Sequence, residues 1–150
     1  DTFCVPVENS VGLYHKYKVH GVFYKIHFMN TDEDRLADIG VVITPHGNTV
    51  ANTDERNALC ARKWSRFKML SQENRRWISG YVDIKRLEGR PYLDDSYFSA
   101  TYNANPGFTP KMTILTRNAD TAVANPIIQL RVELTFKVEF HDKIYRSTTD

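Results

Sequence analysis

An uninterrupted alternation of apolar and polar residues runs from Ile128 to His141, I-Q-L-R-V-E-L-T-F-K-V-E-F-H, and it limits the possible folds more than any other feature. Successive side chains of a β-strand point to opposite faces, so a period of two predicts a strand with one buried face and one wetter face. An amphipathic helix requires apolar residues three and four positions apart, which this segment lacks. At about 3.4 Å per residue the strand would be about 45 Å long, so we expect a large sheet around it.

A second alternating run extends from residue 14 to residue 29, and its phase changes at Gly21. Tyr17 and Val19 precede the change, and an apolar row of the opposite parity begins at Val22 and reaches Phe28. Two interpretations remain open. Either one continuous strand has a β-bulge at Gly21, or two strands meet at His20 and Gly21.

The remaining patterns predict short strands separated by turns and long loops. We expect strands over residues 39–44, 64–71, 77–87 and 111–117, a turn at 45–48 and a weak strand at 97–102 within a long loop over 92–110. Residues 54–61 predict a short helix with Thr53 or Asp54 as its N-cap. Seven or eight strands with almost no helix predict an all-β fold, a two-sheet antiparallel sandwich, and the long last strand favours a single jelly roll over an immunoglobulin fold.

Length and composition indicate one globular domain over residues 1–150. The net charge of +2 is too small to indicate a nucleic-acid partner by itself, and no apolar run is long enough to cross a bilayer, so we expect no membrane partner. Cys4 and Cys60 form no disulfide framework, and we expect two free thiols rather than a bridge.

Signatures of catalysis are missing from the sequence. The five histidines have neither the H-x-H nor the H-x-x-x-H spacing of a metal site, and no G-x-S-x-G or P-loop motif is present. We therefore expect no enzyme, no catalytic residue and no cofactor. The acidic cluster of Asp32, Glu33, Asp34 and Asp38 predicts a solvated loop, with a structural Ca²⁺ at a subunit contact as the alternative.

Residues 56–90 form a basic segment, with ten Lys or Arg against three acids, a balance of +7. Aromatic residues are interleaved at positions 64, 67, 77 and 81. Cations with aromatics are typical of surfaces that bind phosphate backbones and stacked bases. The candidate nucleic-acid-binding residues are Arg62, Lys63, Arg66, Lys68, Arg75 and Arg76. The alternative is that the aromatics are core and the charges form a solvated face.

Several segments in order carry a family resemblance: Y-H-K-Y-K-V-H-G-V-F-Y-K-I-H-F at 14–28, I-G-V-V-I-T at 39–44, W-S-R-F-K-M-L-S at 64–71, G-Y-V-D-I-K-R-L-E-G at 80–89 and N-P-I-I-Q-L-R-V-E-L-T-F-K-V-E-F-H-D-K at 125–143. Together they resemble the single jelly-roll capsid proteins of small circular single-stranded DNA viruses, the circovirus-like group. The resemblance covers residues 13–143 and lies in strand order and texture.

The resemblance implies a structural subunit of an icosahedral shell, a homo-oligomer of sixty copies whose interior contacts a single-stranded DNA genome. It implies a location in the virion, with assembly in the host nucleus. The Arg-rich N-terminal arm of such proteins is expected upstream of Asp1, because residues 1–12 carry no such run. The host-cell receptor stays unknown.

Aromatic residues near the long loop are candidates for the subunit interface, because interface cores are enriched in such side chains. They are Tyr92, Tyr97, Phe98, Tyr102 and Phe108. Each could instead pack beneath its own loop. The rival function is a carbohydrate- or ligand-recognition β-sandwich, similar to a lectin, that uses the loop over 92–110 as its ligand site and does not assemble.

Overall fold

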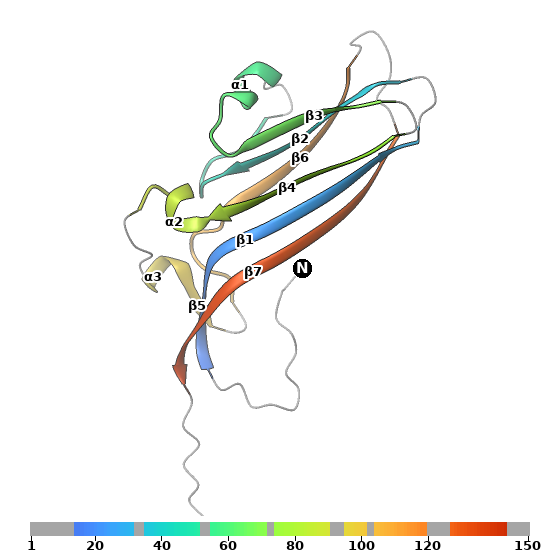
Figure 1. Cartoon of the computed structure of the whole chain (residues 1–150). Coiled ribbons are helices and arrows are strands. Elements are labelled where there is room, and N and C mark those ends of the chain that lie inside the picture. Colours follow the sequence, from blue (N-terminus) through green and yellow to red (C-terminus); the bar gives the residue numbers. More distant parts are fainter. Residues whose placement is uncertain are drawn as a thin grey trace, which may run out of the picture.

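Strand β1 (Tyr14–Asn30) lies at the centre of the larger of two antiparallel sheets (Figure 1). Strand β7 (Ile128–Lys143) pairs with β1 along almost its whole length. The other edge of β1 is shared by β4 (Arg75–Asp83) and the short β5 (Ser99–Thr101). We call these four strands sheet A. The computed structural model describes residues 14–31, 35–51, 55–71, 74–90, 95–101, 104–119 and 127–143.

Sheet B contains three strands among the described residues, with β2 (Ala37–Thr44) between β3 (Ser65–Leu70) and β6 (Lys111–Asn118). Three short helices complete the described chain: α1 (Arg56–Cys60), α2 (Ile84–Leu87) and α3 (Asp95–Phe98). The inner faces of both sheets share one core, in which Ile26 and Phe28 of β1 pack in the same cluster as Ile39 and Val41 of β2. The predicted all-β, two-sheet antiparallel sandwich is therefore confirmed.

The chain passes between the sheets in a nested order. Strand β1 lies in sheet A, β2 and β3 lie in sheet B, β4 returns to pair with β1, and then β6 joins sheet B and β7 joins sheet A. Such crossings between two antiparallel sheets are typical of β-sandwiches.

A β-bulge at His20 and Gly21 keeps β1 continuous. The register with β7 shifts between Val19 and Gly21, so the apolar row on either side of the bulge stays on the inner face. A Cβ on Gly21 would lie 2.3 Å from the Tyr81 hydroxyl oxygen, which explains why glycine occupies this position. The single bulged strand is confirmed, and the alternative of two strands is wrong.

Strand β2 is buried on both faces, which explains its unbroken apolar sequence. Its inner face packs in the shared core, and its outer face lies beneath α1, where Val42 contacts a second cluster with Leu59 and Leu115. No described element covers the outer face of sheet A in the same way. The two outer faces of the sandwich therefore differ in chemistry.

The apolar face of β7 is not fully buried, contrary to the prediction. Leu130 and Phe140 are 48% and 60% exposed, and Val132 and Val138 are also exposed. Among the described residues β7 pairs only with β1 and β6 pairs only with β2, so both sheets have a free edge at β7 and β6. Figure 1 shows β7 at one margin of sheet A, with β4 at the other. The strand was predicted correctly, but its apolar row extends past the cover that sheet B provides.

Three local predictions need correction. The strand predicted over 77–87 ends at Asp83, because the Asp83 carboxylate accepts a hydrogen bond from the backbone N–H of Arg86 and begins α2. Helix α1 starts at Arg56 with Glu55 at its cap position and no side-chain cap bond, so neither Thr53 nor Asp54 is its N-cap. Within the loop predicted over 92–110, residues 95–98 form the unpredicted helix α3, whereas the weak strand predicted over 97–102 is found as β5.

The other predicted strands and the turn at 45–48 are found, the turn with Gly47 at a φ of 82°. Residues 1–13 and 120–126 lie outside the described residues. Cys60 is a free, exposed thiol, as expected, and Cys4 is not described.

Gly40 offers a test of the packing between sheet B and its cover. A Cβ at Gly40 would lie 2.3 Å from the Phe67 ring, so Gly40→Ala should lower the free energy of unfolding by about 1–3 kcal/mol, the usual cost of overpacking. Urea denaturation followed by tryptophan fluorescence measures the change.

Gly107→Ala is the matched control, because a Cβ there would be 3.6 Å from its nearest atom, an ordinary contact. Its free energy of unfolding should stay within about 0.5 kcal/mol of the parent. Equal effects of the two substitutions would contradict the packing described here.

Candidate nucleic-acid interface

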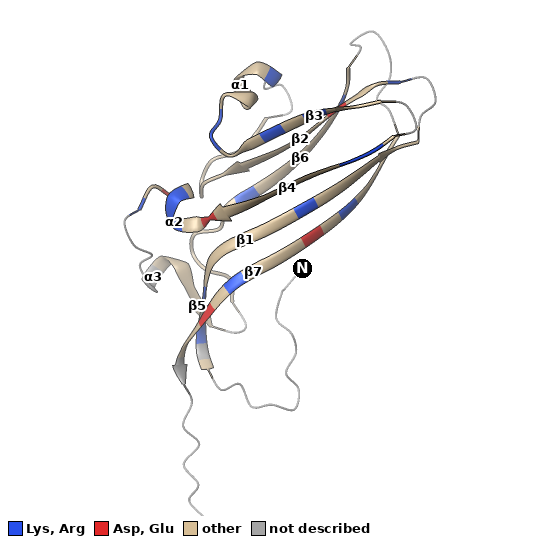
Figure 2. Cartoon of the chain, viewed as in Figure 1, with Lys and Arg blue, Asp and Glu red and all other residues tan. Residues whose placement is uncertain are grey.

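The six cations predicted to bind nucleic acid come from neighbouring parts of the fold. Arg62 and Lys63 lie in the connection between α1 and β3, two more lie in β3, and Arg75 and Arg76 begin β4. Figure 2 shows Lys and Arg on this connection, on β3 and at one end of β4, along the margin opposite β7. We call this the basic margin.

Two of these cations also hold the two sheets together. Arg66 donates a hydrogen bond from a guanidinium nitrogen to the Ser79 carbonyl oxygen at 2.8 Å, and the Lys68 ammonium donates to the Trp77 carbonyl oxygen at 3.0 Å. Both acceptors belong to β4, whose outer edge has no strand partner among the described residues. Arg66 and Lys68 thus satisfy backbone acceptors of an edge strand and close this side of the sandwich.

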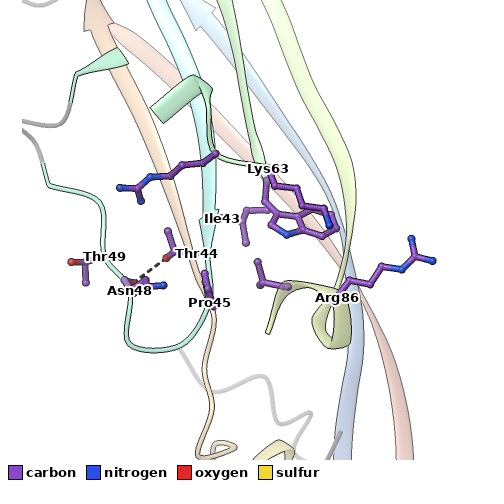
Figure 3. Close-up of a pocket in the computed structure, with 10 residues that line it drawn as sticks. Ile43, Thr44, Pro45, Asn48, Thr49, Lys63 and Arg86 are labelled. Atoms are coloured by element: carbon purple, nitrogen blue, oxygen red, sulfur yellow. Dashed lines mark hydrogen bonds between the residues drawn. The ribbon is translucent and has the colours of Figure 1, made fainter. Parts of the chain in front are cut away.

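A broad pocket of about 540 Å³ lies next to the basic margin (Figure 3). Three cations line it, Arg62, Lys63 and Arg86, together with Trp64 and residues of the β2 end and the following turn. Figure 3 shows Lys63 and Arg86 on one side and Asn48 and Thr49 on the other. The Lys63 ammonium lies 5.4 Å from the centre of the Trp64 ring. Three cations around an open, aromatic-walled pocket favour a phosphate-bearing ligand.

Arg86 was not among the predicted site residues, although it belongs to the basic segment. In an extended strand the side chain of Arg86 would point to the opposite face from those of its two neighbours. The turn of α2 instead places it beside Lys63 and Arg62. Asp is a preferred N-cap residue, and an interpretation of Asp83 as an N-cap would have predicted a helical turn beginning at residue 84.

Arg56 and Asp38 form an ion pair with each other. The Arg56 guanidinium forms a close ion pair with the Asp38 carboxylate, which is mostly buried, and it also lies over the Phe67 ring. Asp38 is therefore engaged in an ion pair rather than available to the acidic cluster considered for Ca²⁺, and residues 32–34 are not described. No group of three or more His, Cys, Asp or Glu side chains suited to a metal occurs within the described ranges.

Of the aromatics predicted at the subunit interface, Phe98 requires a correction. It is 2% exposed and belongs to the core, where its ring meets the Phe108 ring edge to face at 5.3 Å. Phe108 is half-buried against the same core, so both follow the alternative of packing beneath their own loop. Tyr97 is exposed and stacks on Phe108 at 4.9 Å. Tyr92 and Tyr102 lie outside the described residues.

The four aromatics within the basic segment divide between core and surface. Trp64 packs against the main core, and Phe67 packs against the cluster beneath α1. Trp77 and Tyr81 are exposed, because they occupy alternate positions of β4 that point away from the core. The alternative that the aromatics are core is confirmed for Trp64 and Phe67, and a binding role for Trp77 and Tyr81 stays a prediction.

Burial and side-chain contacts shift the pKa values of two described titratable groups, Tyr24 and Glu139. Burial raises the pKa of the Tyr24 phenol, and the nearby Arg66 charge opposes that shift. On the outer face of sheet A, a short hydrogen bond with His20 is the main cause that lowers the pKa of Glu139 below its ordinary 4.5. The His141 charge lowers it further.

No protein-family model matches the sequence, and no curated protein matches it. Among the described helices, none is long and apolar enough to cross a membrane.

The contacts of Arg66 and Lys68 predict an effect on stability. Replacing both with Ala should lower the free energy of unfolding by about 1 kcal/mol, because two exposed charge-assisted hydrogen bonds to edge carbonyls are lost. Urea denaturation checks this, with Lys85→Ala on the exposed side of α2 as the control. An unchanged midpoint in the double variant would show that the two bonds contribute nothing to the fold.

The lowered pKa of Glu139 predicts a pH dependence. A carboxyl group with a depressed pKa in the folded state stabilises the fold above its ordinary pKa, and that contribution disappears as the pH falls through the lowered value. The urea midpoint of the parent protein should therefore fall more steeply below about pH 4.5 than that of Glu139→Gln. Superimposable pH profiles would exclude a stabilising role for this contact.

Proposed function

We propose that the chain is a structural subunit of an icosahedral viral shell that encloses a single-stranded DNA genome. The observation that carries this proposal is the uncovered apolar row of β7, beside the free edges of β7 and β6. Another polypeptide chain can pair as a β-strand with an exposed strand edge and cover its apolar side chains. Monomeric proteins normally protect such edges.

The energetic gain from covering this row favours a protein built for assembly. Leu130, Val132, Val138 and Phe140 are each at least one third exposed, so complete burial would contribute about 1 kcal/mol per side chain. Backbone hydrogen bonds at the free edges would add to this gain. The four side chains together would contribute about 4 kcal/mol, which is close to the lower end of the stability of a single domain, about 5–15 kcal/mol.

The basic margin and its pocket support contact with nucleic acid. Lys63, Arg75 and Arg76 are exposed, and with Arg62 and Arg86 they provide several positive charges on one side of the sandwich. Such a surface binds phosphates with little preference for sequence and with strong dependence on salt. This agrees with a genome-packaging role more closely than with a neutral sugar ligand.

The resemblance to circovirus-like capsid proteins supplies the remainder of the proposal, because jelly rolls host many functions and fold alone does not select one. Sixty copies, a location in the virion and assembly in the host nucleus follow from that resemblance.

Assembly can be tested by measuring mass in solution. Sixty copies of a 17.4 kDa chain give about 1.0 MDa, so light scattering should find a particle of that size. Absorbance at 260 nm in excess of the protein contribution should accompany it when nucleic acid is packaged. A 17.4 kDa monomer at every salt concentration and pH would contradict the proposal.

The nucleic-acid part is tested by replacing Lys63, Arg76 and Arg86 together with Ala. Particles of unchanged mass with a lower ratio of absorbance at 260 to 280 nm are expected, because phosphate neutralisation is lost while the Arg66 and Lys68 contacts stay. Lys85→Ala with Lys111→Ala is the control, since both are exposed lysines that do not line the pocket. Equal nucleic-acid content in both sets of particles would exclude the basic margin as a packaging surface.

A further inference from the structure

The outer face of sheet A has three large aromatic side chains in the open. Phe23 of β1 and Trp77 of β4 are 53% and 54% exposed, and Tyr81 of β4 is 37% exposed. Residue pairing places Phe23 opposite Tyr81 and His27 opposite Trp77, so all three belong to the face that points away from the core. We call Phe23, Trp77 and Tyr81 the aromatic platform.

The platform has an ordered geometry. The rings of Phe23 and Tyr81 lie 4.4 Å apart with their planes at 35°, and the Lys25 ammonium lies 5.9 Å from the centre of the Trp77 ring. Lys25 pairs with Ser79, so its rung lies between the rungs that carry the aromatics. A shallow depression of about 360 Å³, lined by Phe23, Lys25, Tyr81 and others, opens on this face. Along β1 and β4, Lys25 therefore lies between the Phe23–Tyr81 ring pair and the Trp77 ring.

The charges around the platform favour an anionic ligand. Lys25, Arg75 and Lys137 occupy outward-facing positions of β1, β4 and β7. The acids of the same face have positive or hydrogen-bonding partners. The Glu133 carboxylate is 3.2 Å from Arg131 and 3.5 Å from His27, Glu139 contacts His20, and Asp83 accepts a hydrogen bond from the backbone N–H of Arg86.

A ligand with both phosphates and exposed planar rings matches this surface. Unpaired bases stack on aromatic side chains without regard to sequence, whereas the bases of a duplex are already stacked on one another. A purely apolar partner would leave Lys25, Arg75 and Lys137 without counterions, and an anion without rings would leave the platform uncovered.

We propose that the aromatic platform binds single-stranded DNA by stacking unpaired bases on Trp77, Tyr81 and Phe23, while Lys25, Arg75 and Lys137 contact its phosphates. The proposal rests on the proposed function and orients the subunit within the shell: sheet A faces the genome, and sheet B with its α1 cover faces outward. The basic margin is continuous with the platform through Arg66 and Lys68, which bond the carbonyl groups of Ser79 and Trp77.

The test uses the purified full chain and a fluorescently labelled oligothymidylate, with anisotropy reporting affinity. Trp77→Ala and Tyr81→Ala should each weaken binding by roughly ten-fold, the typical loss for one stacked base. Tyr97→Ala is the matched control, an exposed aromatic outside the platform, and should leave affinity unchanged. Trp77→Tyr keeps a stacking ring and should restore most of the binding. Urea denaturation of each variant shows that the fold is retained.

A second readout separates stacking from charge. In a Trp64→Phe background Trp77 is the only tryptophan, because the chain has two, and saturating oligothymidylate should quench its emission. Lys25→Ala should reduce the dependence of affinity on salt, whereas Trp77→Ala should leave it unchanged. A duplex of equal length should bind more weakly than the single strand.

Two results would overturn the proposal: full affinity in Trp77→Ala with Tyr81→Ala, or no change in Trp77 emission at saturation. Binding of an oligosaccharide in place of the oligonucleotide would likewise replace it with a sugar-recognition role. Particle mass is measured separately, so shells that package DNA but have an inert platform would refute only this inference. A monomer that stacks oligothymidylate on Trp77 would refute only the shell.

Discussion

Strand β1 has hydrogen-bonding partners on both edges, and the arrangement of the other elements depends on how these edges are filled. One edge is taken by β7 along almost its full length. The other is divided between β4 and β5, and between β1 and β4 the chain forms β2 and β3 of sheet B. The bulge at Gly21 is part of the same constraint, since without it the apolar residues on one side of the bulge would face solvent.

Within the described residues, the outer faces of the two sheets differ because only sheet B has a helical cover. Helix α1 contributes Leu59 to a cluster over β2, and Arg56 extends that cover across Phe67. Sheet A instead presents Phe23, Trp77 and Tyr81 to solvent within a frame of cations. In a shell, each subunit would have one outer face covered by α1 and one outer face whose exposed aromatic and cationic side chains could contact a ligand. The free edges of β7 and β6 lie on a third side, where neighbouring polypeptide can add.

Some Lys and Arg side chains of this fold bond backbone carbonyl groups and others line a pocket. Their positions in the sequence do not show which of the two each one does. Arg66 and Lys68 hold β3 against β4 through backbone carbonyl groups, whereas Lys63 and Arg86 line an open pocket. All four belong to one basic segment. An edge strand needs donors for its outward carbonyl groups, and long cationic side chains on the neighbouring sheet can supply them. A basic run in an all-β protein can therefore include cations with a structural role beside cations that line a surface pocket.

The sequence by itself determined the strands, because a period of two in the 128–141 and 14–29 runs excludes a helix and Gly21 marks the change of phase. It also predicted the two-sheet class and the basic segment. Only the tertiary structure decided which side chains are covered. Phe98 is buried and Trp77 exposed although both are aromatic residues in polar surroundings, and Leu130 and Val132 are exposed although their pattern predicts burial. Alternation specifies which face a side chain occupies, but burial depends on whether another layer lies opposite that face, and that layer comes from residues distant in the sequence.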